Sequence, residues 1–320
     1  MQPDVTFVIA AYNAETFLAR AVQSALGQRG VSVEVVVIDD CSSDGTVELA
    51  RSFPPETVKV IALDKNRGPG GARNAGLEAA SGRWIAVLDA DDTVQPERLA
   101  RMIRRAEAAG AQIAVDNLDV IHEEPGTRET MFPHSHLEAV SEITLADFIA
   151  ANILFEGTFN YGYMKPIFER RFIEEHQLRY DETLRIGEDY IFLASALAKG
   201  GRCVAEPEAG YDYHIRDGSI SRVLEQHHVK AMFEADAAFL REHQLDEAAK
   251  SAQARRTRSL EKAASFLALV QHLKDRAPLK AMGAALRDPV ALKHLRMPIA
   301  ARLRRFAEPL RGRKAAGQAG

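Results

Sequence analysis

Short β-branched runs alternate with helical patterns over the first part of the 320-residue chain, and this alternation constrains its fold more than any other feature. The runs predicted to be strands are residues 5–10, 33–38, 58–63 and 84–88. Each is typical of a buried strand, and helical or turn-forming residues separate it from the next. Strands that alternate with helices form a mostly parallel sheet with helices on both faces. The sequence therefore predicts an α/β fold.

Polar residues directly follow three of these predicted strands. They are residues 11–13, 39–40 and 89–92. In open α/β sheets, ligands bind beyond the carboxyl ends of the strands. We therefore expect the three clusters to meet at one edge of the sheet and to form the binding site.

Composition excludes several classes of protein. The net charge of -4 gives no sign of nucleic-acid binding by the whole chain. The two cysteines, Cys41 and Cys203, lack metal-ligand spacing and indicate no disulfide framework, which fits a reducing cytoplasm. The N-terminus has no signal-peptide pattern, and no stretch approaches the roughly 18 apolar residues of a membrane span. We expect a protein that works in the cytosol or at a membrane surface.

Two carboxylates, Asp89 and Asp91, come directly after the fourth predicted strand. A hard divalent cation is held by one or two carboxylates together with phosphate oxygens, so this pair suits a substrate that contains a diphosphate. One carboxylate could face the metal and the other a ribose. The alternative is a turn with a capping aspartate before the helix that starts near Pro96.

Two further charged residues lie near the ends of predicted strands. Asp40 could accept a hydrogen bond from a base N–H, or it could belong to an Asx-type turn. Arg73 is predicted in the first turn of a helix behind the glycine-rich turn 68–71, where it could bind an anion. The alternative is a surface arginine paired with an acid such as Glu78. The turn is neither a Walker A loop nor a Rossmann fingerprint.

The later half of the chain carries two more candidate features. Glu188 and Asp189 precede an apolar helix over residues 190–198, where a carboxylate could take the proton of an attacking hydroxyl or could simply cap the helix. His214 and Arg216 could bring a cationic lid over a diphosphate, or could belong to an edge strand and a turn.

The remaining sequence predicts a loop over 123–136, a helix over 142–155 and helices from about 225 onward. The tail, residues 291–314, holds eight Lys or Arg and one acid, with apolar residues at helical spacing. A basic amphipathic helix either binds a membrane surface or packs its apolar face on the domain.

Five of these motifs together resemble the family 2 glycosyltransferases, which have the GT-A fold. They occur in the family's order within roughly residues 4–220: residues 8–13 (VIAAYN), 35–46 (VVVIDDCSSDGT), 66–76 (NRGPGGARNAG), 88–92 (LDADD) and 187–189 (GED). The resemblance implies a GT-A domain over residues 1–220 and a helical C-terminal region over 221–320.

The resemblance also implies roles for single residues. The uracil and ribose should lie among Ala10, Tyr12, Asn13 and Asp40. The rest of the nucleotide-sugar site would be formed by Arg73, Asp89, His214 and Arg216. The metal, Mn²⁺ or Mg²⁺, would be bound by Asp91 with Asp89 close by. The catalytic base would be Asp189, supported by Glu188.

Family members invert the anomeric centre of the donor in one displacement. Their relatives that build bacterial exopolysaccharides imply a UDP-sugar donor, a saccharide or lipid-linked acceptor, and a cytoplasmic protein that can contact the inner face of the membrane through residues 291–314. Processive synthases carry a Gln-x-x-Arg-Trp motif, but the single tryptophan here, Trp84, lies in a predicted strand. We therefore expect one sugar to be added per encounter.

Two other functions fit parts of the pattern. A sugar nucleotidyltransferase would also use an α/β sheet and a metal, but it needs a glycine-rich basic signature after the first strand, which residues 11–15 lack. A catalytically silent module that binds nucleotide sugars is the second alternative. Turnover of a donor distinguishes the silent module from an enzyme.

Overall fold

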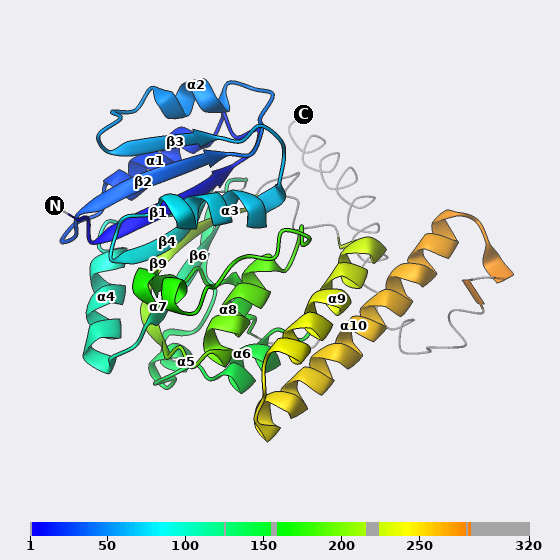
Figure 1. Ribbon diagram of the computed structural model, residues 1–320. Coiled ribbons are helices and arrows are strands. Elements are labelled where there is room, and N and C mark those ends of the chain that lie inside the picture. Colours follow the sequence, from blue (N-terminus) through cyan, green and yellow to red (C-terminus); the bar gives the residue numbers. More distant parts are fainter. Residues whose placement is uncertain (1, 125, 155–158, 216–223, 280, 283–320) are drawn as a thin grey trace, which may run out of the picture.

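The computed structural model describes residues 2–124, 126–154, 159–215, 224–279 and 281–282 (Figure 1). Its strands are β1 (Val5–Ala11), β2 (Val33–Asp39), β3 (Val58–Ala62), β4 (Trp84–Asp89), β5 (Thr93–Val94), β6 (Ile113–His122), β7 (Thr127–Thr130), β8 (Ile167–Glu169) and β9 (Cys203–Ile215). Its α-helices are α1 (Leu18–Leu26), α2 (Thr46–Arg51), α3 (Gly68–Ala79), α4 (Arg98–Ala109), α5 (His134–Glu138), α6 (Leu145–Ala151), α7 (Arg170–Glu175), α8 (Glu188–Ala198), α9 (Gln226–Glu242) and α10 (Glu247–Lys274).

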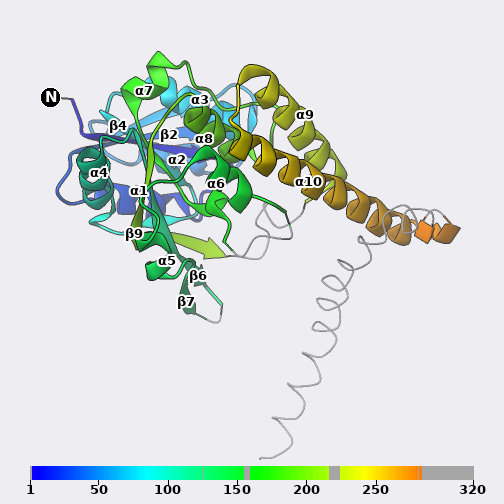
Figure 2. The ribbon, with the colours of Figure 1, turned by 90° about the horizontal axis from the view of Figure 1, so that it is seen from below.

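The described strands form one nine-stranded sheet in the order β3-β2-β1-β4-β8-β6-β9-β5, with β7 paired to β6. The pairs among β3, β2, β1 and β4 are parallel, whereas β8 runs antiparallel to both β4 and β6. Helix α3 covers one face of the parallel half, and α1 and α2 cover the other (Figures 1 and 2). The predicted fold class is confirmed, and all four predicted strands are present.

The register of the parallel strands brings the polar clusters together. Ala10 lies beside Asp89, and Ala11 lies beside Asp39. The amide of Asp40 also donates to the carbonyl oxygen of Ala11 at 2.8 Å. The predicted meeting of strand ends is therefore confirmed, because parallel strands in register must present their carboxyl ends at one edge.

Helix α3 corrects one local prediction. It begins at Gly68, so residues 68–71 belong to the helix and Arg73 lies in its second turn, not its first. Proline is tolerated at the start of a helix, which is why Pro69 does not break it. Gly76 further along α3 has a packing role, because a Cβ there would lie 2.3 Å from Val8 and 2.8 Å from Ile38. The glycines thus allow a tight approach of the helix to the sheet.

Two smaller predictions also change. The segment 123–136, predicted as a loop, contains β7 and the start of α5. The helix predicted over 142–155 is shorter, because Thr144 caps α6 and Asn152 ends it. At the start of α2, Gly45 occupies the cap position, and the Asp44 carboxylate accepts from the Thr46 amide at 3.1 Å.

The predicted C-terminal helices are present as α9 and α10, which lie side by side next to α6 and α8 (Figure 2). Phe239, Leu245, Ala249 and Ala252 belong to the same hydrophobic core as the sheet. The proposed boundary near residue 220 and the basic tail at 291–314 both fall outside the described residues. Among the described residues, no helix has the length and hydropathy needed to span a membrane.

Candidate active site

Arg73 is the centre of a cluster of charges at the carboxyl edge of β4. Its Nη2 atom lies 2.8 Å from Asp89 Oδ1, and its Nη1 atom lies 2.6 Å from Glu188 Oε1 and 2.9 Å from Asp189 Oδ1. The guanidinium is buried, with 6% of the side chain exposed. Arg73 therefore joins the acids of β4 to those at the start of α8.

Lys165 forms a second bridge in the same cluster, although no sequence motif predicts it. Its Nζ atom lies 2.8 Å from Asp89 Oδ2 and 3.2 Å from Asp189 Oδ2. The residue belongs to the irregular stretch before β8, where no periodic pattern singles out a lysine. Only its closeness in sequence to the aromatic and glycine-rich segment 159–163 marks it as part of a binding region.

A buried ion pair beneath the cluster fixes Lys165. Arg98, from the first turn of α4, donates to both carboxylate oxygens of Asp116 at 2.8 Å and to the carbonyl oxygen of Lys165 at 2.5 Å. Arg98 and Asp116 are essentially inaccessible to solvent. The Arg98 guanidinium also lies 5.2 Å from the ring centroid of Tyr211. The backbone that carries Lys165 is thus anchored to the core by charge-assisted hydrogen bonds.

The position of α8 places both of its first two acids in the cluster. Gly187 has φ 92°, a left-handed conformation that favours glycine and turns the chain into the helix. Glu188 and Asp189 then occupy the first helical turn, where the helix dipole favours negative charge. Both the capping and the catalytic interpretations of these acids are therefore compatible with their location.

The pKa values of two carboxylates in the cluster, Asp89 and Glu188, shift in opposite directions. Burial disfavours ionisation of Asp89, but the cations of Lys165 and Arg73 outweigh it and hold the pKa of Asp89 well below its ordinary value. Burial, with the neighbouring charge of Asp189, raises the pKa of Glu188. Despite burial, the charges of Asp89 and Asp189 raise the pKa of Lys165, which stays protonated. Asp89 is thus a permanent anion in this site.

The predicted nucleotide-binding residues surround the ends of β1 and β2. Tyr12 is 51% exposed, and Asn13 adopts a positive φ of 49° while its Oδ1 atom accepts from the Ser43 amide at 2.9 Å. Asp40 is buried, and its two carboxylate oxygens accept from the amides of Arg67 at 2.6 Å and Gly68 at 2.8 Å. Asp40 therefore holds the start of α3, which leaves its contact with a base a prediction.

The remaining acids of the 89–92 motif have different environments. Asp92 is fully buried and accepts from the Tyr211 hydroxyl at 2.7 Å and the His214 amide at 2.8 Å, so it is structural. Asp91 is only half-buried. The His214 ring is buried beside Thr93, and burial lowers the pKa of this imidazole. His214 is therefore neutral near pH 7, and Arg216 lies outside the described residues.

The donor set of this edge fits a partly ligated divalent cation. Among the residues that the structure describes, no group of three or more His, Cys, Asp or Glu side chains is poised to cage a metal. Mg²⁺ and Mn²⁺ in phosphate sites use one or two carboxylates and take the remaining ligands from phosphate and water. Both oxygens of Asp89 pair with cations, and the assignment of Asp91 and Asp89 as metal ligands stays a prediction.

Replacing Lys165 with methionine should lower turnover about tenfold, equivalent to about 1.4 kcal/mol. Without the ammonium, Asp89 and Asp189 keep Arg73 but lose the second of their two shared cations, so their mutual repulsion is less well compensated. The matched control is Lys199→Met. Lys199 lies at the C-terminal end of α8, and its Nζ atom is 3.7 Å from Oε1 of Glu242 in α9. Steady-state rates for both variants check the prediction, and equal rates in the two would contradict it.

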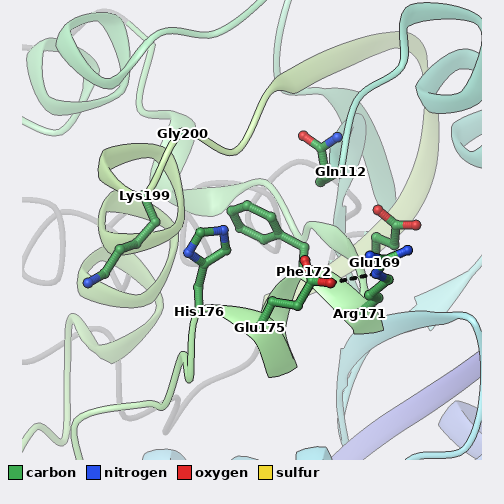
Figure 3. Close-up of a pocket in the computed structure, with 8 residues that line it drawn as sticks. All are labelled: Gln112, Glu169, Arg171, Phe172, Glu175, His176, Lys199 and Gly200. Atoms are coloured by element: carbon green, nitrogen blue, oxygen red, sulfur yellow. Dashed lines mark hydrogen bonds and ion pairs between the residues drawn. The ribbon is translucent and has the colours of Figure 1, made fainter.

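A separate cavity of about 330 Å³ lies near the start of β4, at the opposite end of the strand from Asp89. Its lining includes Glu169, His176 and Lys199 (Figure 3). Glu169 pairs with Trp84 at the start of β4, whereas Asp89 ends that strand. Five residues of a strand span about 16 Å, so this cavity is distinct from the charged cluster.

Comparisons with known proteins identify the family of this chain. A profile described as Glycosyl transferase family 2 matches residues 6–172. The succinoglycan biosynthesis protein ExoO of Rhizobium meliloti (strain 1021) is 62% identical over 305 residues, which cover 95% of this chain and 87% of ExoO. The succinoglycan biosynthesis protein ExoU of the same strain is 34% identical, covering 90% of this chain and 84% of ExoU.

Solved structures show the same fold. TarS 1-349 from S. aureus in complex with UDP-GlcNAc has a TM-score of 0.62 at 17% identity, covering 89% of this chain and 92% of that one. The mannosyltransferase PcManGT from Pyrobaculum calidifontis in complex with GDP-Man and Mn²⁺ has a TM-score of 0.61 at 17% identity, covering 95% and 81%. The family match sets aside the nucleotidyltransferase alternative. The chain belongs to the family 2 glycosyltransferases and has their GT-A fold.

Proposed function

We propose that this glycosyltransferase moves one sugar from a UDP-sugar to a saccharide or lipid-linked oligosaccharide, with inversion at the anomeric carbon, during exopolysaccharide synthesis. The observation that carries the proposal is the double bridge between Asp89 and Asp189 through Arg73 and Lys165. A carboxylate at the nucleotide edge and a carboxylate at the start of a separate helix thus lie on either side of the same two cations.

The proposed reaction is a single displacement. The acceptor hydroxyl oxygen attacks the anomeric carbon and forms the new glycosidic bond, while the bond between that carbon and the β-phosphate oxygen breaks. Asp189 takes the hydroxyl proton, and UDP leaves with the bonding electron pair. Arg73 and Lys165 hold Asp189 in place by ion pairs at 2.9 and 3.2 Å.

The charge balance of the cluster favours a metal-dependent reaction. Within the part of the chain that the structure describes, the three acids Asp89, Glu188 and Asp189 form ion pairs with two cations, Arg73 and Lys165. Asp91 follows Asp89 by two positions in the chain. A nucleotide diphosphate brings further negative charge to this edge. A divalent cation, held by Asp91 with help from Asp89, would neutralise that charge as the diphosphate leaves.

Relatives support the choice of donor and acceptor. ExoO and ExoU are described as succinoglycan biosynthesis proteins, and TarS was solved with UDP-GlcNAc. PcManGT was solved with GDP-Man and Mn²⁺. We extend these descriptions to a saccharide acceptor and a divalent metal here. We place the reaction on the cytoplasmic side of the membrane, where lipid-linked acceptors would be within reach.

The test is UDP release from UDP-glucose, UDP-galactose, UDP-N-acetylglucosamine and UDP-glucuronate with Mn²⁺ or Mg²⁺, with GDP-mannose as the non-uridine comparison. We expect turnover of one UDP-sugar that EDTA abolishes. Asp91→Ala should reduce it at least about tenfold, whereas Asp275→Ala, at the C-terminal end of α10, should not.

Each part of the proposal can fail separately in this experiment. No turnover of any donor together with no UDP binding would overturn the transferase activity. Full turnover in EDTA would contradict the proposed metal dependence. Preferential use of GDP-mannose would contradict the proposed uridine nucleotide in the donor. The anomeric configuration of a transferred sugar, measured by NMR, tests inversion directly.

A further inference from the structure

Tyr163 and Tyr213 come from different parts of the chain and form an aromatic pair. Their ring centroids lie 6.0 Å apart at an interplanar angle of 59°. Tyr163 is 45% exposed, one of the most exposed large hydrophobic side chains among the described residues, and Tyr213 is half-buried. A tyrosine ring held at the surface by a second ring offers a preformed apolar face with a polar tip.

Tyr163 and Tyr213 are each close in sequence to a residue that contacts an acid of the charged cluster. Tyr163 ends the short 3₁₀ helix Tyr161–Tyr163, two residues before Lys165, whose ammonium contacts Asp189. Tyr213 shares a face of β9 with Tyr211, because side chains two apart point the same way in a strand. The Tyr211 hydroxyl accepts from the Asp89 amide at 3.2 Å. Each tyrosine is therefore two residues away from a residue whose side chain contacts Asp89 or Asp189.

The pair comes from the other side of β4 from the predicted nucleotide residues. The predicted nucleotide residues Tyr12, Asn13 and Asp40 come from the ends of β1 and β2, on the other side of β4 from β8, β6 and β9. Tyr163 instead approaches from the segment that delivers Lys165 to Asp189, the proposed base. This placement, away from the nucleotide residues and next in the chain to a partner of Asp189, favours contact with the acceptor over contact with the nucleotide.

We propose that Tyr163 and Tyr213 form the acceptor subsite and stack against a sugar ring at the acceptor's reacting end. The C–H bonds on one face of a pyranose carry partial positive charge, which complements the negative face of an aromatic ring. This inference rests on the proposed function. It adds a binding site for a saccharide, separate from the nucleotide site.

The test measures saccharide binding by the full chain in the presence of UDP and Mn²⁺. The probes are octyl β-glucoside, octyl β-galactoside and octyl β-cellobioside, followed by ligand-observed NMR. We expect at least one probe to bind, and Tyr163→Ala to weaken it about tenfold, a loss of about 1.4 kcal/mol. Tyr163→Phe keeps the ring and should bind within about twofold of the natural chain.

Leu240→Ala is the matched control, because Leu240 is 44% exposed on α9 and its loss should leave saccharide binding unchanged. Equal binding in Tyr163→Ala and the natural chain, or no binding by the natural chain, would overturn the subsite. Weaker binding of UDP in Tyr163→Ala would move the pair to the donor site and also overturn it. UDP release from the donor panel, run on the same samples, shows separately whether the transferase activity itself stands.

Discussion

Replacing Asp189 with asparagine should lower turnover by at least about 100-fold, the lower range for loss of a general base. Asparagine has nearly the same shape but cannot accept the hydroxyl proton. Arg73 and Lys165, which lie 2.9 and 3.2 Å from the Asp189 carboxylate, remain paired with Asp89. The affinity for UDP should therefore change by less than about threefold, about 0.7 kcal/mol.

Two other variants make this result specific. Glu188→Gln alters the adjacent acid, which is buried and lies 2.6 Å from Arg73 Nη1, so it should impair turnover through positioning and by less than Asp189→Asn. Asp275→Asn makes the same chemical change at the end of α10 and should leave turnover intact. Steady-state kinetics and UDP titration check all three. An Asp189→Asn enzyme that keeps half of its turnover would exclude Asp189 as the base.

The sequence predicted the meeting of the polar strand ends well because its signals are local. Each strand is a short apolar run, and the polar residues come directly after it. Parallel pairing then forces those residues to one edge, as the pairing of Ala10 with Asp89 and of Ala11 with Asp39 confirms. The acids at 188–189 were also found, because a Gly-Glu-Asp turn before an apolar helix is visible without any knowledge of the fold.

The rest of the site depends on contacts distant in sequence. Lys165 acquires its role only when β8 inserts between β4 and β6, which brings it to Asp89 and Asp189. Arg98, within an ordinary amphipathic pattern, is buried because it pairs with Asp116 and binds the Lys165 carbonyl. Neither residue has a sequence signal that distinguishes it from a surface cation. A fully buried arginine can be recognised only once its partner is placed.

The same logic applies to Arg256, which connects the C-terminal helices to the helix that carries Asp189. Its Nε atom donates to Asp236 Oδ2 at 2.9 Å and its Nη1 atom to the Asn152 carbonyl at 3.0 Å, and both members of the ion pair are 5% exposed. Its guanidinium lies 3.5 Å from the ring centroid of Tyr190, the residue after Asp189. One side chain thus ties α10 to α9, α6 and α8.

Arg256→Met should lower the free energy of unfolding by about 3–5 kcal/mol, because it leaves the Asp236 carboxylate buried without its cation. The double variant Arg256→Met/Asp236→Leu should recover most of that loss, since an apolar pair replaces the ionic one. Arg171→Met removes a cation from an exposed pair with Glu175 and should leave the denaturation midpoint unchanged. Denaturant unfolding followed by circular dichroism measures all three.

The number of unfolding transitions shows whether α9 and α10 unfold together with the sheet. We predicted residues 221–320 as a region distinct from the GT-A domain, yet Phe239 and Ala252 pack into the core that contains the sheet. If α9 and α10 fold as one unit with that core, Arg256→Met will shift a single cooperative transition and lower turnover with it, because α8 loses its anchor at Tyr190. Two separate transitions, with turnover lost only in the second, would instead establish the C-terminal helices as an independent domain.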